Sequence, residues 1–158
     1  MKSLPADISI LVLRVGISIL MLHHGLEKLA DPAGFSEFVV GKYFGFLPFG
    51  PLFWTYAAAI TQLLCPIGLA LGILTRPCAL GLSMTMLFAL IFHGLDTGLE
   101  GFPFAVVPDH NYAFEMAAVY FMCFVYFLCS GAGRISLYTL IKNEPPSSDI
   151  NITLNTLL

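Results

Sequence analysis

Five polar side chains flank the outer ends of apolar segments in this chain. The first segment ends near His23, His24 and Lys28, the third ends near His93, and the fourth begins near Glu115. His24 and Lys28 share a helical face because they are four residues apart. Two histidines and a carboxylate suit metal ligation, proton exchange with a quinone headgroup, or a buried hydrogen-bonded network. No H-x-x-x-H or E-x-x-H pair is present, so we predict no metal site and treat the group as a ligand-binding or polar cluster.

A second polar group lies deeper in the apolar sequence. Arg14 interrupts the first segment and Gln62 lies near the middle of the second. Pro66 lacks an amide hydrogen, which leaves the backbone carbonyl of Gln62 without its helical donor. We therefore predict an intramembrane polar pair in which Arg14 donates to the Gln62 side chain and to that carbonyl. The alternative is a polar wall for a bound small molecule.

The apolar segments that carry these residues are long enough to cross a membrane. Hydrophobic residues make up 58% of the 158 residues, charged residues only 11%, and the mean hydropathy is +0.85. A bilayer-crossing helix needs about 20 apolar residues. We expect an all-α integral membrane bundle of four transmembrane helices, at Ile8–Leu26, Leu52–Leu74, Pro77–Leu95 and Tyr112–Ser130. The net charge of -3 and the lack of a basic run argue against nucleic acid as a partner.

The first outer loop has its own helical signals. Asp31-Pro32 is typical of an N-cap followed by proline at the first helical position. Phe35, Phe38 and Val39 are then expected to share one face. The aromatic residues that follow, between Tyr43 and Trp54, suit a membrane interface. We expect a short interfacial helix here.

Positive charges near the ends of the spans predict orientation. Lys2, Arg76, Arg134 and Lys142 fall on one side of the predicted arrangement, which places both termini in the cytoplasm. We divide the chain into a transmembrane domain at 1–137 and a polar cytoplasmic tail at 138–158. In this tail, the alternation of apolar and polar residues from Ile150 favours either a frayed end or a strand that pairs with a partner.

Small residues and cysteines in the spans suggest packing roles. Gly68 and Gly72 form a G-x-x-x-G motif, for which helix packing within the bundle or dimerisation is expected. The four cysteines form no C-x-x-C pair, so we interpret them as buried thiols and predict no redox pair.

In order along the chain, several short motifs resemble the DoxX family of small bacterial membrane proteins. The resemblance runs to about Leu137. It includes Arg14-Val15-Gly16, Leu22-His23-His24-Gly25, Gly72-Ile73-Leu74-Thr75-Arg76, His93, Glu115 and the run Gly131-Ala132-Gly133-Arg134-Ile135-Ser136. The family commonly has a glutamate where this chain has Gln62, so an ionised partner for Arg14 at that position is absent.

The resemblance implies a small membrane subunit of a larger, redox-linked assembly. Such a subunit would anchor partner subunits and host a quinone or a similar ligand. The alternatives are a purely structural or assembly subunit, and a subunit that binds haem or chlorophyll. The sequence contains no recognisable catalytic constellation. We expect membrane lipids and other membrane proteins as partners, with a homo-oligomer as an alternative, in the bacterial inner membrane or an internal membrane.

Overall fold

The computed structural model describes residues 4–99, 101–107 and 111–143, which form helices and loops and contain no strand. In chain order the helices are α1 (Leu4–Ala30), α2 (Pro32–Phe35), the π-helix η1 (Ser36–Gly41), α3 (Lys42–Phe44), α4 (Pro51–Leu71), α5 (Thr75–Asp96), α6 (Glu115–Ser130) and α7 (Leu137–Asn143). The all-α prediction is confirmed for these residues. The predicted strand beginning at Ile150 lies outside them.

Three of the helices are long and apolar enough to cross a membrane, namely α1, α4 and α5. The helix α6 is also apolar but has 16 residues. Large apolar side chains point outward from all four, including Val12, Leu64, Leu80 and Met122, each at least 50% exposed. Helices suit this setting because they satisfy their own backbone hydrogen bonds where no water is present.

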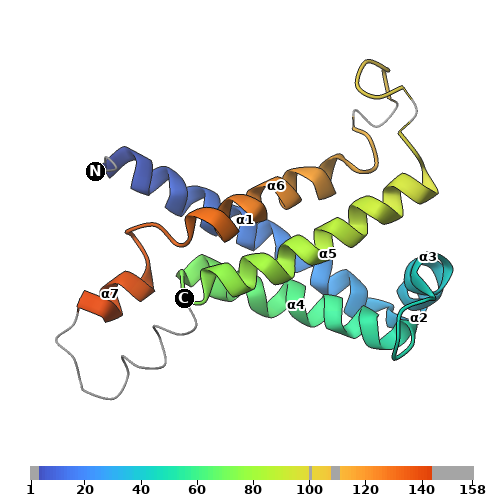
Figure 1. The fold of residues 1–158 in the computed structure, drawn as a ribbon, viewed down its shortest axis with the longest axis horizontal. Helices are drawn as coiled ribbons and strands as arrows, with labels where there is room; N and C mark the ends of the chain where they lie inside the picture. The colour runs from blue at the N-terminus through green and yellow to red at the C-terminus, as the bar shows by residue number, and fades with distance from the viewer. Residues whose placement is uncertain (1–3, 100, 108–110, 144–158) are drawn as a thin grey trace.

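The helices pack in chain order, with α1 against α4, α4 against α5, and α5 against α6. Figure 1 shows α4 and α5 side by side, with α2 and α3 gathered at the end where α4 begins. Met21, Leu69, Leu82, Phe124 and Phe127 are fully buried between the helices. These side chains come from all four long helices, so they form one common core.

A tight turn joins α4 to α5. Gly72 adopts a left-handed conformation with φ 72° and ends α4. The Ile73 amide donates to the Gly68 carbonyl at 2.9 Å, a pattern typical of helix C-termini that end on glycine. A methyl group on Gly68 would lie 2.8 Å from Cys78 Sγ on α5. In this structure the glycines of the G-x-x-x-G motif therefore make close contacts within the bundle.

The outer segment α2–η1–α3 begins as its sequence predicts. The Asp31 side chain accepts a hydrogen bond from the Gly34 amide at 2.9 Å, and Pro32 occupies the start of α2. The expected common face was wrong in one residue. Phe35 and Val39 line a cavity inside the bundle, whereas Phe38 is 69% exposed. The cause is the π-helix, whose wider turn changes which residues share a face.

Candidate ligand-binding cavity

A cavity of about 410 Å³ lies between α1, α4, α5 and α6 and is closed on one side by the outer segment. Aromatic and aliphatic side chains form most of its wall, among them Phe35, Phe44, Trp54, Phe88 and Phe92. Cavities of this size and lining are typical of small-molecule sites, in which a few polar groups orient an otherwise apolar ligand.

Four polar residues from the predicted groups line this cavity: His24, Lys28, Gln62 and His93. The Lys28 ammonium donates to the His24 carbonyl at 3.1 Å and lies 4.7 Å from the centre of the Phe35 ring. Within the described part of the chain, no carboxylate forms an ion pair with Lys28. The partly buried Lys28 ammonium can therefore donate a further hydrogen bond to an acceptor in the cavity.

His24 is oriented from two sides. Its Nδ1 lies 3.4 Å from a carboxylate oxygen of Glu27, one turn along α1. Its ring meets the Tyr120 ring edge to face, with 5.5 Å between the centroids. Because both contacts fix the imidazole plane, His24 presents a defined polar edge to a ligand.

Gln62 lies at the same depth as His24. A methyl group on Gly25 would lie 2.7 Å from Leu63 Cγ and 3.0 Å from the Ala59 carbonyl oxygen. This close approach of α1 to α4 fixes the register of the two helices. His24 and Gln62 therefore lie at a similar level along the bundle axis. Gln62 is 2% exposed, and its side-chain oxygen has no hydrogen-bond partner among the described residues. A buried amide without a partner is costly, and a ligand would satisfy it.

Arg14 does not pair with Gln62 in this structure. Its two terminal nitrogens donate instead to the backbone carbonyls of Ala132 and Ile135, the latter at 2.9 Å. A methyl group on Gly72 would lie 2.8 Å from the same guanidinium. The loop after α6 therefore folds back under α1 and supplies the acceptors that the sequence analysis had assigned to α4.

Two residues of the predicted cluster, His23 and Glu115, do not line the cavity. His23 is exposed and its ring lies against that of His24, with 3.9 Å between the centroids. The potential ligand atoms of His23, His24 and Glu27 lie within 4.8 Å of one another, so these three residues could hold a metal ion. All three come from a single turn and a half of α1.

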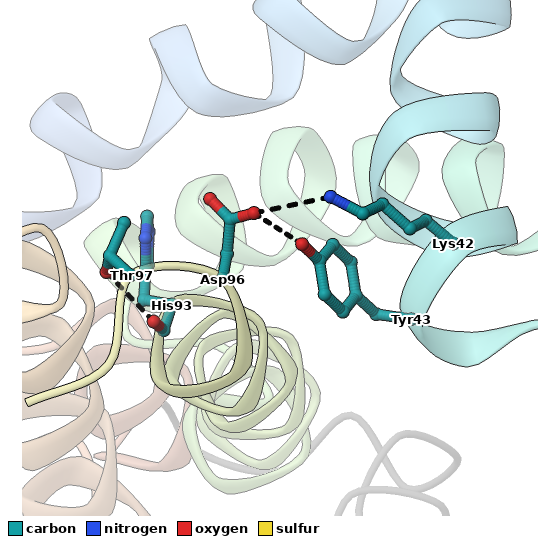
Figure 2. A network of polar contacts seen from close by, with 5 residues as sticks. All are labelled: Lys42, Tyr43, His93, Asp96 and Thr97. Carbon is teal, nitrogen blue, oxygen red and sulfur yellow. Dashed lines mark hydrogen bonds and ion pairs between the residues drawn. The ribbon is translucent and has the colours of Figure 1, made fainter.

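A polar network ties the outer segment to the end of α5 (Figure 2). The Tyr43 hydroxyl donates a hydrogen bond to Asp96, and the Lys42 ammonium lies 3.6 Å from the same carboxylate. Hydrogen bonding to Tyr43, followed by the charges of Tyr43 and Asp96, raises the pKa of Lys42. The Thr97 hydroxyl donates to the His93 carbonyl at 2.9 Å and caps the helix end. The sequence analysis missed this network because its members are far apart in the chain.

Comparison with known proteins identifies relatives without an assigned activity. An uncharacterised protein of Haemophilus influenzae is 28% identical over 152 residues, which cover 93% of this chain and 92% of that protein. No solved structure matches the chain. The model of the DoxX family matches residues 9–94, more than half of the sequence. The chain is therefore a membrane protein that belongs to the DoxX family.

Proposed function

We propose that this protein is a small membrane subunit of a redox-linked assembly and that it binds a quinone in the cavity. The observation that carries this proposal is an apolar cavity with a few polar groups: Lys28 and His24 can donate hydrogen bonds, and the Gln62 side-chain oxygen has no partner among the described residues. Lys28, His24 and the Gln62 amide surround its polar part. The carbonyl oxygens of a quinone accept hydrogen bonds from such groups, and its apolar tail fits against aromatic walls.

The charge of the cavity also favours an acceptor ligand. Of its described lining residues, Lys28 is cationic and none is a carboxylate. A cationic ligand would be repelled there, whereas a carbonyl or an anion would be stabilised. A histidine beside the headgroup adds a proton donor and acceptor, which two-electron quinone chemistry requires.

The proposed topology has four spans, with α6 as the fourth. The helix α6 packs on α5 along an apolar length, and the preceding residues 111–114 lengthen this segment. In this topology the transmembrane domain is 1–137, the tail 138–158 is cytoplasmic, and both termini lie in the cytoplasm. The exposed Arg134 supports this orientation, because positive charges are retained on the cytoplasmic side.

In the same topology the outer segment lies at the opposite membrane interface. In this segment Phe38 is 69% exposed, and in the loop that follows it Phe46 and Phe49 are each 79% exposed. Amphipathic segments with exposed aromatic side chains are typical of the boundary between headgroups and acyl chains. Such a surface contacts lipid, and it is also available to a partner subunit.

Quinone binding can be measured through Trp54. It is the chain's one tryptophan and it lines the cavity, so its fluorescence reports on occupancy. The full chain in lipid nanodiscs would be titrated with a short-chain quinone. We expect saturable quenching, and roughly tenfold weaker binding for His24→Ala, because a hydrogen bond in an apolar site is lost.

His23→Ala is the matched control, because it removes the neighbouring imidazole that lies outside the cavity. Its affinity should equal that of the wild type. If the double variant His24→Ala with His93→Ala binds the quinone as tightly as the wild type, the quinone assignment is wrong.

The assembly role needs a separate measurement. Native mass spectrometry of the protein, extracted in mild detergent at its natural abundance, should reveal redox partner subunits. A bare homo-oligomer would contradict the role as a subunit while leaving quinone binding intact.

A further inference from the structure

Two cysteines that are 13 positions apart in the sequence meet across the α4–α5 hairpin. Cys65 on α4 packs against Gly81 of α5, and Cys78 on α5 packs against Gly68 of α4, so the two thiols face the same α4–α5 contact. Both belong to the layer of half-buried side chains packed against the common core. The sequence analysis predicted no cysteine pair, because the spacing fits no C-x-x-C motif. The turn at Gly72 nevertheless brings the two positions together.

Glycines explain how closely the helices approach at this point. Each cysteine is followed three residues later by a glycine, as Cys65–Gly68 and Cys78–Gly81. A methyl group on Gly68 would lie 2.8 Å from Cys78 Sγ, and one on Gly81 would lie 3.7 Å from Cys65 Sγ. Each thiol therefore occupies the space that a side chain on the opposite helix would fill. Close backbone approach is also what a disulfide needs, because its Cα atoms must be about 4.4–6.8 Å apart.

The pair adjoins the proposed quinone site. Gln62, one turn before Cys65, lines the cavity, and so does Gly81. Gly81 has no side chain to separate the cavity from the Cys65 thiol, which lies 3.7 Å from where its methyl group would be. Cys65 thus lies behind the part of the cavity wall that Gln62 and Gly81 form, next to the place of a headgroup held by Gln62.

We propose that Cys65 and Cys78 are a redox-active dithiol that the quinone in the cavity oxidises to a disulfide. This inference rests on the proposed function. Two S–H bonds break and one S–S bond forms. The two electrons and two protons pass to the two carbonyl oxygens of the quinone, which leaves as a quinol. A dithiol substrate then reduces the Cys65–Cys78 disulfide by thiol–disulfide exchange, which restores the dithiol and leaves the substrate as a disulfide. The protein would thus exchange reducing equivalents between a thiol or disulfide substrate and the quinone pool.

The first test counts thiols in the unmodified full chain. The protein in lipid nanodiscs would be reduced, freed of reductant and incubated with a short-chain quinone. It would then be denatured in acid and labelled with a maleimide-coupled polymer that shifts its mobility on a gel. The chain contains four free cysteines. We expect the number of labelled thiols to fall from four to two, with one quinone reduced per chain.

Variants then locate the disulfide. In the double variant Cys123→Ala with Cys129→Ala, quinone should remove both remaining thiols from labelling. In Cys65→Ala and in Cys78→Ala, all three remaining thiols should still be labelled, and no quinone should be reduced. Copper phenanthroline, an oxidant that does not need the cavity, should form the same disulfide in the wild type.

The outcomes separate this inference from the function on which it rests. If quinone quenches Trp54 saturably but four thiols are still labelled, the redox pair is rejected and the binding site stands. If copper phenanthroline also fails to form the disulfide, the cysteine geometry itself is rejected. If quinone does not bind at all, the proposed function and its dithiol reaction both fall.

Discussion

Polar side chains near the N-terminal end of α1 bind other groups of the same chain. Polar side chains near the C-terminal end of α1 line a cavity instead. The first group is the arginine network, comprising Asp7, Arg14 and Arg134 with the carbonyls of Ala132 and Ile135. Arg134 binds the buried Asp7 carboxylate with Nε at 2.8 Å and Nη2 at 2.6 Å. Arg14, which is 1% exposed, donates to both carbonyls, although its Nε and the second Asp7 oxygen have no partner among the described residues.

The cavity residues are equally polar but differently used. Gln62 is as deeply buried as Arg14, yet its side-chain oxygen has no partner among the described residues. Among the described residues, Lys28 donates to a backbone carbonyl of its own helix and lies over the Phe35 ring. The contrast indicates that the arginine network maintains the fold, while the cavity keeps binding capacity at some cost in stability. The two regions should therefore respond to substitution in opposite ways.

The largest expected effect is the loss of Arg14. In Arg14→Leu, the partly buried carbonyls of Ala132 and Ile135 lose their donors, and the loop after α6 loses its attachment to α1. We expect destabilisation on the order of 3 kcal/mol, since hydrogen bonds from charged groups and unsatisfied acceptors each contribute about 1–3 kcal/mol. Thermal unfolding in mild detergent would measure it. Quinone affinity of the remaining folded protein should be unchanged.

Two glycine variants provide the matched comparison for Arg14. In Gly72→Ala, the methyl group meets Ser136 Cβ at 2.5 Å and the Arg14 guanidinium at 2.8 Å, and the backbone has φ 72°, so the stability should fall. In Gly16→Ala, nothing lies within 4 Å of the new methyl group. This variant should be neutral or slightly stabilising, because alanine favours helix. Equal stability of the two variants would contradict the close packing of the Gly72 turn against Arg14 and Ser136.

The apolar segments predicted the long helices well, because period and length are local properties. Asp31-Pro32 also predicted the start of α2 correctly, since capping depends on neighbouring residues. Arg14 shows where this information ends. Its polar character at membrane depth demanded a partner, but its acceptors lie 118 and 121 positions away in the chain. Only the fold of the loop after α6 determines that choice.

The candidate site was predicted only in part, because some of its contacts join residues that are distant in the sequence. His24, Lys28 and His93 do line one cavity, but His23 does not, because adjacent residues on a helix point about 100° apart. The Cys65–Cys78 pair was missed, although the repeated C-x-x-G pattern on both sides of the Gly72 turn is a readable signal. It places cysteines and glycines opposite one another in an antiparallel hairpin.

At Gln62 we expect effects of intermediate size: a gain in fold stability and a loss of quinone affinity. In Gln62→Leu, an unsatisfied buried amide is replaced by an apolar side chain of similar size. The fold should gain about 1 kcal/mol, because the desolvation cost of the amide disappears. Quinone affinity should fall roughly tenfold, because the Gln62 amide group no longer contacts the headgroup. Thermal unfolding and Trp54 quenching would measure the two changes on one sample.

Thr61→Val is the control for Gln62, because Thr61 also lines the cavity but its hydroxyl already donates to the Ala57 carbonyl at 2.8 Å. It should not stabilise the fold. If Gln62→Leu lowers the stability instead, Gln62 has a structural partner, and its distinction from Arg14 disappears.

The smallest expected effect concerns access to the cavity past the outer segment. Asp96 attaches α3 to the end of α5 through Tyr43 and Lys42, while Phe44 of α3 forms part of the cavity wall. In Asp96→Asn the charge is lost, so the outer segment should separate from α5 more often. Because exposed ion pairs contribute little, we expect quinone association and dissociation to accelerate together by about threefold, with the equilibrium affinity nearly constant. Stopped-flow quenching of Trp54 would resolve both rates.

Glu37→Gln, which removes an exposed charge from the same segment, should leave both rates unchanged. If the rates in Asp96→Asn are unchanged, the ligand enters directly between the helices. The outer segment would then play no part in access to the cavity.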